Sequence, residues 1–319
     1  MLFFFYLCSM IPQSGSNRQY IREEGPNGKT QIRVIGTSKD ENNAFITLAR
    51  HFRSKGLHVP EVYSVSADGM EYTQEDLGDT LLYEAIAQGR ASGSFSDNEI
   101  ALLIKTIRQL AHIQTEGAQG LDWSVCYPVA EFDRRSVMWD LNYFKYCFLK
   151  LQGLDFSEPM LEDDFDQMAE TLLSEPAETF LYRDFQSRNV MVKDGEPWFI
   201  DFQGGRRGPV YYDLASFLWQ AKARFPQSLR DQLIAEYIDE LKYINAACSI
   251  CFNRETLPHF VLFRTLQVLG AYGFRGLIEK KQHFIESIPF AKENLRGIFD
   301  TYPVLAHDYP YIHQIALQL

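Results

Sequence analysis

The first part of the chain alternates apolar and polar positions in short runs separated by turn sequences. Between residues 41 and 55 the apolar residues instead recur at three- and four-residue spacing, which predicts a helix ending at Gly56. Two hairpins are predicted around the turns Gly-Pro-Asn-Gly and Asp-Gly, formed by residues 17–24 with 29–36 and by residues 62–65 with 70–73. This part of the sequence therefore predicts a small antiparallel sheet that carries one helix.

From about residue 79 onward the spacing of apolar residues becomes helical. Ser96 and Glu99 form a capping-box pattern directly before an apolar helical face, so a helix begins there. Further helices are predicted over residues 130–151, 160–174, 213–225, 228–246, 254–280 and 283–299. The larger part of the chain is thus mainly helical.

One β interruption divides the helical part. Residues 179–182 read as a short strand, and residues 190–193 and 198–200 read as a tight hairpin. Pairing across that hairpin brings the residue before one strand close to the residue after the other, namely Asn189 and Asp201. Asp184 lies on the loop leading into the hairpin, so three polar side chains are expected to converge.

This set of side chains suits phosphoryl transfer. An Asn and an Asp supply the oxygen ligands that Mg²⁺ needs against the phosphates of ATP, and a second Asp can take the proton of an acceptor hydroxyl. Taken singly, Asp184 reads equally well as a turn residue and Asn189 as a cap. Asp201 follows an apolar run, where a carboxylate is costly unless it is paired. The three together favour a catalytic site.

The net charge and the cysteine content limit the kinds of binding partner and metal site that we expect. The 319 residues contain 31 Lys and Arg against 42 Asp and Glu, a formal net charge of −11, which disfavours binding to nucleic acid. Five scattered cysteines predict no disulfide framework, and the pair Cys248 and Cys251 lacks the further ligands of a zinc site. The apolar first eleven residues are too short to span a membrane, so we expect an edge element there or an alternative start at Met10. A cytoplasmic protein is expected.

The motif Y-R-D-x-x-x-x-N followed by D-F-Q resembles the aminoglycoside phosphotransferase-type kinases, the small-molecule branch of the protein-kinase-like fold. The resemblance covers nearly the whole chain, from PQSGSNRQYIR through QEDLGD to DFQGGRRGPVYYDLASFL and RTLQVLGAY. The last two stretches are most similar to bacterial kinases that phosphorylate N-acetylmuramate and N-acetylglucosamine at the anomeric hydroxyl.

That resemblance implies an α+β, bilobal protein-kinase-like fold. Residues 1–75 would form a small nucleotide-binding lobe with an antiparallel sheet and one helix. Residues 76–319 would form a larger, mainly helical lobe with the catalytic loop and the substrate site. A hinge at about residues 74–79 would join the two lobes, with ATP in the cleft between them.

The resemblance also assigns roles to residues. Asp184 becomes the catalytic base, and Asn189 and Asp201 become the Mg²⁺ ligands. The residues expected to bind the nucleotide are Ser14, Gly15, Ser16 and Asn17 over the phosphates, Arg22 as a phosphate-binding cation, and Glu75 and Leu77 at the adenine. Tyr182 replaces the usual His, a largely structural position. Arg33 stands near the place of the usual strand lysine, so Arg18 and Arg22 are the candidates to replace its charge.

The acceptor site is expected to involve Asp140, Arg188, Arg206 and Arg207. The two consecutive arginines could pair with a carboxylate such as the lactyl group of muramic acid, or form an ordinary solvated turn. Asp213 is expected to cap a helix and also to brace the catalytic loop.

We therefore expect an ATP- and Mg²⁺-dependent phosphotransferase that acts on a hydroxyl of a small molecule, as a monomer or homodimer. An amino sugar phosphorylated at its anomeric hydroxyl is the favoured acceptor. An aminoglycoside or choline-type substrate is the alternative, which an acidic acceptor cleft would favour. A nucleotide-binding pseudokinase is the alternative of another class, motivated by the missing lysine.

Overall fold

The computed structural model describes residues 9–10, 18–26, 28–244 and 252–319. Its N-terminal lobe contains the strands β1 (Ser9–Met10), β2 (Gln19–Glu24), β3 (Thr30–Ile35), β4 (Val62–Val65) and β5 (Glu71–Glu75). They form one antiparallel sheet in the order β1-β2-β3-β5-β4. The two predicted hairpins are confirmed. Ser9–Met10 pair along the edge of β2, and the rest of the predicted N-terminal edge element lies outside the described residues.

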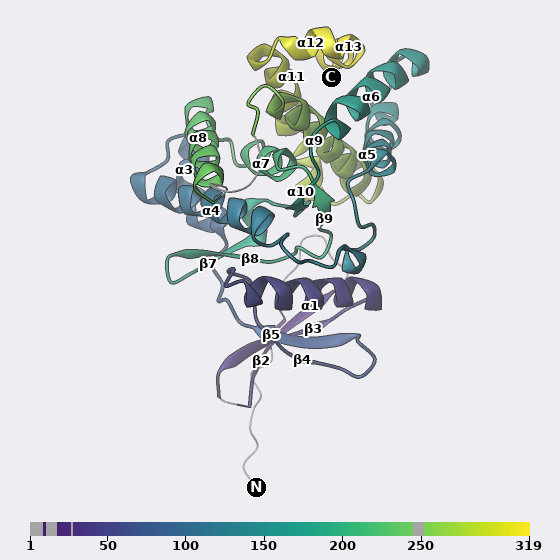
Figure 1. The fold of residues 1–319 in the computed structure, drawn as a ribbon. Helices are drawn as coiled ribbons and strands as arrows, with labels where there is room; N and C mark the ends of the chain where they lie inside the picture. Colours follow the sequence, from purple (N-terminus) through teal and green to yellow (C-terminus); the bar gives the residue numbers. More distant parts are fainter. Residues whose placement is uncertain (1–8, 11–17, 27, 245–251) are drawn as a thin grey trace.

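Helix α1 (Lys39–Ser54) lies between this sheet and the C-terminal lobe (Figure 1). The ring of Phe45 stacks on Tyr72 of the sheet, with the ring centroids 5.2 Å apart, and on Phe202 of the C-terminal lobe at 4.8 Å. Phe52 contacts Phe180 of the C-terminal lobe edge-on at 4.9 Å. One apolar face of α1 thus joins the cores of both lobes, which fixes the sheet relative to the catalytic loop.

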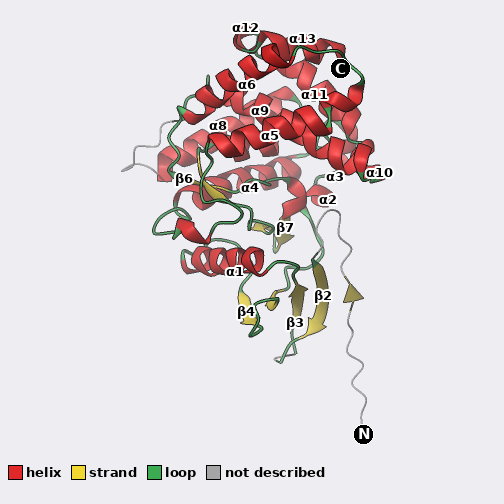
Figure 2. Cartoon of the chain, turned by 90° about the vertical axis from the view of Figure 1, so that its right-hand side faces the viewer, coloured by secondary structure: helices red, strands yellow, loops and turns green. Residues whose placement is uncertain are grey.

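The C-terminal lobe is mainly helical, and the strands are concentrated in the other lobe (Figure 2). Its helices are α2 (Leu82–Ala85), α3 (Ala87–Ser92), α4 (Asp97–Thr115), α5 (Arg134–Cys147), α6 (Glu158–Leu173), α7 (Tyr211–Leu218), α8 (Gln227–Ile244), α9 (Leu257–Tyr272), α10 (Gln282–Ile285), α11 (Ile288–Thr301), α12 (Val304–Asp308) and α13 (Pro310–Gln318). Helix α9 is apolar on nearly every side and packs against α5, α7 and α11, so it forms the centre of this lobe. The predicted capping box at Ser96 and Glu99 is present at the start of α4.

Short strands in the C-terminal lobe position the catalytic loop. They are β6 (Thr179–Leu181), β7 (Val190–Lys193), β8 (Glu196–Phe199) and β9 (Arg206–Gly208). β6 pairs with β9, and β7 pairs with β8 as the predicted hairpin. Short helical turns complete the lobe: η1 (Trp123–Val125), η2 (Leu149–Gln152), η3 (Ser187–Asn189) and the π-helical η4 (Gly273–Ile278).

The hinge between the lobes is tied to the β7–β8 hairpin. The Lys193 ammonium lies 2.6 Å from the Glu75 carboxylate, and the backbone N–H of Val192 donates to the carbonyl of Thr80 at 2.8 Å. These contacts hold the end of β5 against the same hairpin that carries the candidate metal ligands.

The structure corrects several element predictions. The sequence analysis did not predict β9, the short helices α2 and α3, or the C-terminal pair α12 and α13. Helix α7 begins at Tyr211 with Val210 as its N-cap, so the prediction that Asp213 is the N-cap is wrong. Asp213 lies in the first turn of α7, and the Asp213 carboxylate accepts hydrogen bonds from the catalytic loop and does not cap the helix.

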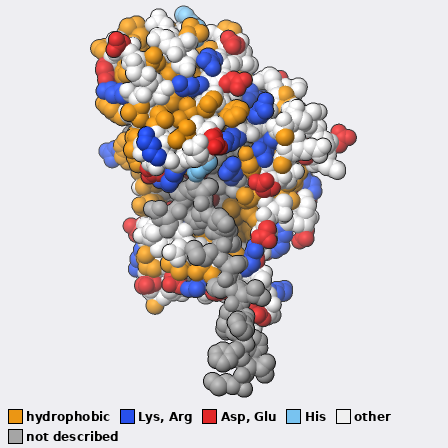
Figure 3. Space-filling view, turned by 180° about the vertical axis from the view of Figure 1, so that it is seen from behind, with side chains coloured by type: hydrophobic (Ala, Val, Ile, Leu, Met, Phe, Trp, Pro, Cys, Tyr) orange, Lys and Arg blue, Asp and Glu red, His pale blue; other side chains and the backbone are white. Residues whose placement is uncertain are grey.

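The surface of the helical lobe seen in Figure 3 is mixed, with Lys and Arg interspersed among Asp, Glu and apolar side chains. Within the described ranges, every helix is too short or too polar to cross a membrane.

Candidate active site

The three predicted catalytic side chains lie together at the mouth of the β7–β8 hairpin. The side-chain amide of Asn189 donates to the backbone carbonyl of Asp184 at 2.8 Å and to the Asp201 carboxylate at 3.2 Å. The Asp184 carboxylate keeps 53% of its surface exposed, so it is available to an acceptor hydroxyl. The geometry therefore gives one accessible carboxylate beside a linked amide–carboxylate pair.

The hairpin register explains why Asn189 and Asp201 meet. Val190 pairs with Phe199, and the backbone N–H of Ile200 donates to the carbonyl of Asn189 at 3.1 Å, so Asp201 follows directly after the residue opposite Asn189. Asp201 has a φ of +67° and Arg183 a φ of +85°, a region that side-chain-bearing residues seldom adopt. Such backbone conformations persist only where the surroundings hold them, and they aim both flanking segments at the site.

The charged form of the Asp201 carboxylate is energetically unfavourable because the side chain is buried. Burial raises its pKa, the amide of Gln203 opposes this by donating to it at 2.7 Å, and the neighbouring Asp184 carboxylate raises it further. A bound cation would relieve that cost. The amide nitrogen of Asn189 is committed to the loop and to Asp201, so its carbonyl oxygen is left as the ligand atom. An amide oxygen and a carboxylate oxygen fit Mg²⁺, whose other ligands would be phosphate oxygens and water.

Asp213 braces the catalytic loop from below. One carboxylate oxygen accepts the backbone N–H of Tyr182 at 2.7 Å and the amide of Gln114 at 3.0 Å, and the other accepts the backbone N–H of Arg183 at 2.9 Å. Burial raises the pKa of Asp213 to about 6, against the effect of these donors. The expected bracing role is present, and it fixes the two residues that precede Asp184.

Tyr182 fills the predicted structural position. Its ring is fully buried and packs edge-on against Phe185 and Phe202, and its hydroxyl donates to the carbonyl of Ile200. The aromatic ring thus links the loop before Asp184 to the strand end before Asp201.

In the N-terminal lobe, Arg18, one of the two arginines considered as a replacement for the missing lysine, pairs with a carboxylate of α1. The buried guanidinium of Arg18 lies 3.2 Å from the Glu41 carboxylate of α1. It is close enough to Asp201 to lower the pKa of that carboxyl. Arg18 therefore forms an Arg–Glu pair next to the candidate metal ligand.

Arg22 is directed to the hinge. Its guanidinium donates to both oxygens of Asp76 at 2.8 and 3.0 Å and lies 2.7 Å from Asp79. Of the two arginine candidates for the phosphate charge, Arg18 is therefore the one nearer to Asp201, and Arg22 binds the carboxylates of Asp76 and Asp79.

The expected adenine contacts lie on this hinge. The backbone N–H of Glu75 donates to the carbonyl of Glu61 at 2.8 Å, and the Leu77 side chain is buried. Adenine contact at these residues remains a prediction. The expected phosphate-covering residues Ser14, Gly15, Ser16 and Asn17 lie outside the described residues.

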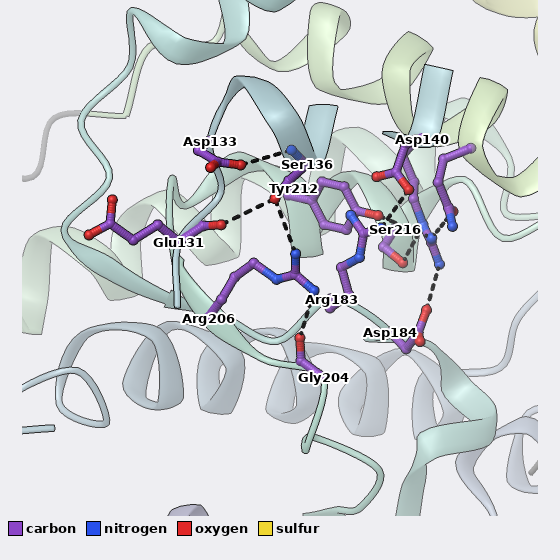
Figure 4. Close-up of polar contacts among 12 residues, drawn as sticks. Glu131, Asp133, Ser136, Asp140, Arg183, Asp184, Gly204, Arg206, Tyr212 and Ser216 are labelled. Carbon is purple, nitrogen blue, oxygen red and sulfur yellow. Dashed lines mark hydrogen bonds and ion pairs between the residues drawn. The ribbon is translucent and has the colours of Figure 1, made fainter. Parts of the chain in front are cut away.

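On the acceptor side, Asp140 and Arg206 point into the protein (Figure 4). Asp140 of α5 pairs with Arg183 at 2.6 Å. Arg206, only 5% exposed, reaches the Ser136 hydroxyl at 3.4 Å and the Gly204 carbonyl at 3.2 Å. Consecutive residues of a strand face opposite sides.

Arg207 accordingly faces the other way. It is 41% exposed and lies 2.5 Å from the Glu131 carboxylate. The predicted arginine pair is therefore split, and only Arg206 lies beside Asp140 and Arg183. The guanidinium carbon of Arg188 lies over the ring of Tyr83, 4.2 Å from the centroid, and that of Arg90 lies 3.3 Å from the same centroid.

Arg264 is a site residue that the sequence analysis did not assign. From α9 it reaches the Asp184 carboxylate at 3.4 Å, the Ser216 hydroxyl at 3.0 Å and the Tyr212 hydroxyl at 3.2 Å. The available signal was a single arginine within the apolar segment LPHFVLFRTLQVLG, because a charge buried in such a helix requires polar partners. The partners themselves, 80 residues away in the case of Asp184, could not be read from the sequence.

The two lobes, the braced Asp184 loop and the Asn189–Asp201 pair define a kinase-like phosphotransferase. Residues 9–245 match the model of the Phosphotransferase enzyme family, and the chain belongs to that family. It is a phosphotransferase that acts on a hydroxyl of a small molecule. The predicted family and bilobal fold are confirmed.

Two curated relatives are both named N-acetylmuramate/N-acetylglucosamine kinase. The protein of Neisseria meningitidis serogroup B is 24% identical over 265 residues, which cover 81% of this chain and 76% of the relative. The protein of Pseudomonas aeruginosa is 23% identical over 226 residues, which cover 69% of this chain and 62% of the relative.

Solved structures share the fold at low identity. An amicoumacin kinase in complex with AMP-PNP, Ca²⁺ and Ami has a TM-score of 0.63 at 12% identity, covering 97% of this chain and 91% of its own. A putative aminoglycoside phosphotransferase from Ralstonia eutropha has a TM-score of 0.63 at 13% identity, covering 93% and 94%. A choline/ethanolamine kinase family protein from Mesorhizobium loti has a TM-score of 0.59 at 13% identity, covering 97% and 94%.

Proposed function

We propose that the protein transfers the γ-phosphoryl group of ATP to the anomeric hydroxyl of an amino sugar of the N-acetylmuramate or N-acetylglucosamine type. The observation that carries this proposal is the convergence of Asp184, Asn189 and Asp201 in a member of the phosphotransferase family. The names of the curated relatives support the amino-sugar acceptor. Because the reaction consumes ATP, we propose a cytoplasmic location, and the names also favour a role in cell-wall recycling.

Asp184 acts as the general base in this proposal. The acceptor oxygen forms a bond to the γ-phosphorus as the bond from that phosphorus to the β,γ-bridging oxygen breaks, ADP leaves, and the hydroxyl proton passes to Asp184. Its exposed carboxylate faces the acceptor, while Arg264 at 3.4 Å and the braced backbone of Arg183 hold it in position.

Asn189 and Asp201 would hold the metal ion. A Mg²⁺ ion bound there supplies neutralising charge for the β- and γ-phosphates of ATP. Arg18, held by Glu41, adds a positive charge beside Asp201 in place of the usual lysine. The hinge residues Glu75 and Leu77 border the adenine, and the whole 1–75 segment serves as the nucleotide-binding lobe.

The charge of the acceptor side favours an amino sugar over a cationic aminoglycoside or choline. Arg183 and Arg264 lie over the ring of Tyr212, and Arg206 is close enough to Arg183 and Asp184 to interact with their charges. A cationic acceptor would be repelled there. The intact catalytic residues argue against a pseudokinase.

The test is transfer of phosphate from ATP to a panel of amino sugars, aminoglycosides and choline. We expect turnover of the amino sugars, and at least a ~10²-fold lower kcat for Asp184→Asn because the general base is lost. Asp239→Asn, an exposed carboxylate on α8 paired with Lys242, is the matched control and should keep wild-type turnover. Turnover of only the cationic acceptors would refute the proposed amino-sugar substrate. ATP binding without turnover of any acceptor would favour a nucleotide-binding pseudokinase.

A further inference from the structure

A cluster of arginines lies next to Asp184, and one of them lacks a carboxylate partner among the described residues. We define the arginine cluster as Arg183, Arg206 and Arg264. Arg183 is paired with Asp140, and Arg264 lies against Asp184. Arg206 has no carboxylate within ion-pair distance in the part of the chain that the structure describes, and its neutral partners lie at 3.2 and 3.4 Å.

The cluster also contains buried polar atoms without a hydrogen-bond partner. These are Nε of Arg206, Nη1 of Arg183 and Oδ2 of Asp140. Native proteins rarely leave such atoms unsatisfied, so each marks a place where a further group is needed. Two open donors and one open acceptor complement a ligand that brings a carboxylate and a hydroxyl.

The electrostatics of Arg206 point the same way. Its burial and the repulsion from Arg183 lower its pKa to about 10, so the guanidinium remains charged near neutral pH but at a cost. An anion bound beside Arg206 would offset the cost of burying its charge. A carboxylate suits this role, because its two oxygens can accept two parallel hydrogen bonds from a guanidinium. Arg206 lies on β9 against α5, in the C-terminal lobe, so the anion belongs to the acceptor rather than to the nucleotide phosphates.

We propose that Arg206, together with Arg183, binds a carboxylate of the acceptor, so that the enzyme selects an acid-bearing amino sugar over its neutral counterpart. This inference rests on the proposed function and names the acceptor chemistry of the same site. N-acetylmuramate carries the carboxylate, and N-acetylglucosamine lacks it. Asp140 then accepts a hydroxyl of the same sugar.

Calorimetric binding of the two sugars tests the inference without requiring turnover. The wild-type protein should bind N-acetylmuramate at least about 10-fold more tightly than N-acetylglucosamine, because a charged hydrogen bond is gained. Arg206→Gln should weaken binding of the acid by about 10- to 100-fold and leave binding of the neutral sugar within about twofold. Arg206→Lys should retain part of the preference, since it keeps the charge but not the fork.

Arg134→Gln is the matched control, because it removes an exposed guanidinium from the first turn of α5, where Arg134 pairs with Asp166 at 2.7 Å. It should bind both sugars as the wild type does. If Arg206→Gln does not fold, the wild-type comparison of N-acetylmuramate with its carboxyl methyl ester decides the question, and only the free acid should bind tightly.

Equal affinity of the wild type for acid and neutral sugar, or failure to bind either, overturns the inference. Equal weakening of both sugars by Arg206→Gln does so as well. A preference for the acid without phosphate transfer to either sugar keeps the anion site and refutes the proposed function. Transfer to both sugars without such a preference keeps the proposed function and refutes the anion site.

Discussion

Asp213, which holds the loop before Asp184 by hydrogen bonds, gives the sharpest prediction. It positions the proposed base without itself reacting, so its substitution tests positioning alone. In Asp213→Asn, one side-chain oxygen becomes an NH₂ group. The two oxygens of Asp213 each accept a backbone N–H, from Tyr182 on one and Arg183 on the other. Either orientation of the asparagine therefore sets its NH₂ against a buried N–H.

The magnitude follows from that geometry. One charge-assisted hydrogen bond is lost and one backbone donor is left without an acceptor, which costs about 2–4 kcal/mol of stability. Asp184 follows directly after Arg183, so the same distortion displaces the base. A displacement of this kind lowers kcat by about 10²-fold. We expect both losses together, measured by urea unfolding and by steady-state phosphate transfer.

Asp164→Asn is the matched control. Asp164 is also buried, but one of its oxygens accepts both of its backbone donors, Tyr311 N–H at 2.9 Å and Ile312 N–H at 2.7 Å. The amide oxygen of an asparagine can keep both bonds. Asp164→Asn should therefore lose little stability and keep wild-type kcat. Unchanged kcat in Asp213→Asn, or an equal loss in both variants, would refute the bracing argument.

The pH dependence gives a second measurement on the same residue. The pKa of Asp213 in the folded protein, about 6, lies above its ordinary value of 3.8. Its contribution to stability is therefore fully present below pH 3.8 and is lost as the pH rises through 6. Activity needs the carboxylate form to hold the loop, so kcat should fall as the pH drops below about 6, and Asp213→Asn should lack this limb.

Three further predictions concern packing, the base and the metal. Gly270→Ala would put a Cβ 2.7 Å from the backbone nitrogen of Phe144 and should lower the free energy of unfolding by about 1–3 kcal/mol. Gly297→Ala has open space around its Cβ and should raise the free energy of unfolding by about 0.5–1 kcal/mol. Both are measured by urea unfolding, and equal effects of the two substitutions would contradict the packing at Gly270. Arg264→Gln should lower kcat by about 10- to 100-fold with a smaller change in the acceptor KM, because the guanidinium orients the base; a change in KM alone would assign it to substrate binding. Removal of divalent metal with EDTA should abolish transfer, and Asp201→Asn should raise the Mg²⁺ concentration needed for half-maximal activity by at least about 10-fold; an unchanged requirement would place the metal elsewhere.

The sequence correctly predicted those elements whose stabilising contacts join residues close together in the chain. The capping box at Ser96 and the β7–β8 hairpin depend on residues a few positions apart, and both appear as predicted. The change from strand spacing to helical spacing after β5 (Glu71–Glu75) was likewise visible in the sequence. The short strand β9 was missed, because three residues give too little alternation to predict pairing with a distant strand.

The acceptor side shows where sequence reasoning stopped. Arg206 and Arg207 were predicted as a pair, yet one is buried beside Arg183 and the other is exposed against Glu131. Their sequence is compatible with either residue facing inward, since strand register decides which side a residue faces. That register is set by pairing of β9 with β6, a contact between segments far apart in the chain.

By itself, the sequence predicted the class of fold and the meeting of the three candidate site residues, because Asp184, Asn189 and Asp201 are brought together by one loop and one hairpin. Only the tertiary structure decided which cations accompany them. Arg18 meets Glu41, and Arg264 meets Asp184, across segments that approach each other only when the helices pack. The physical reason is that backbone hydrogen bonding is periodic and local, whereas the direction of a long charged side chain depends on what packs around it.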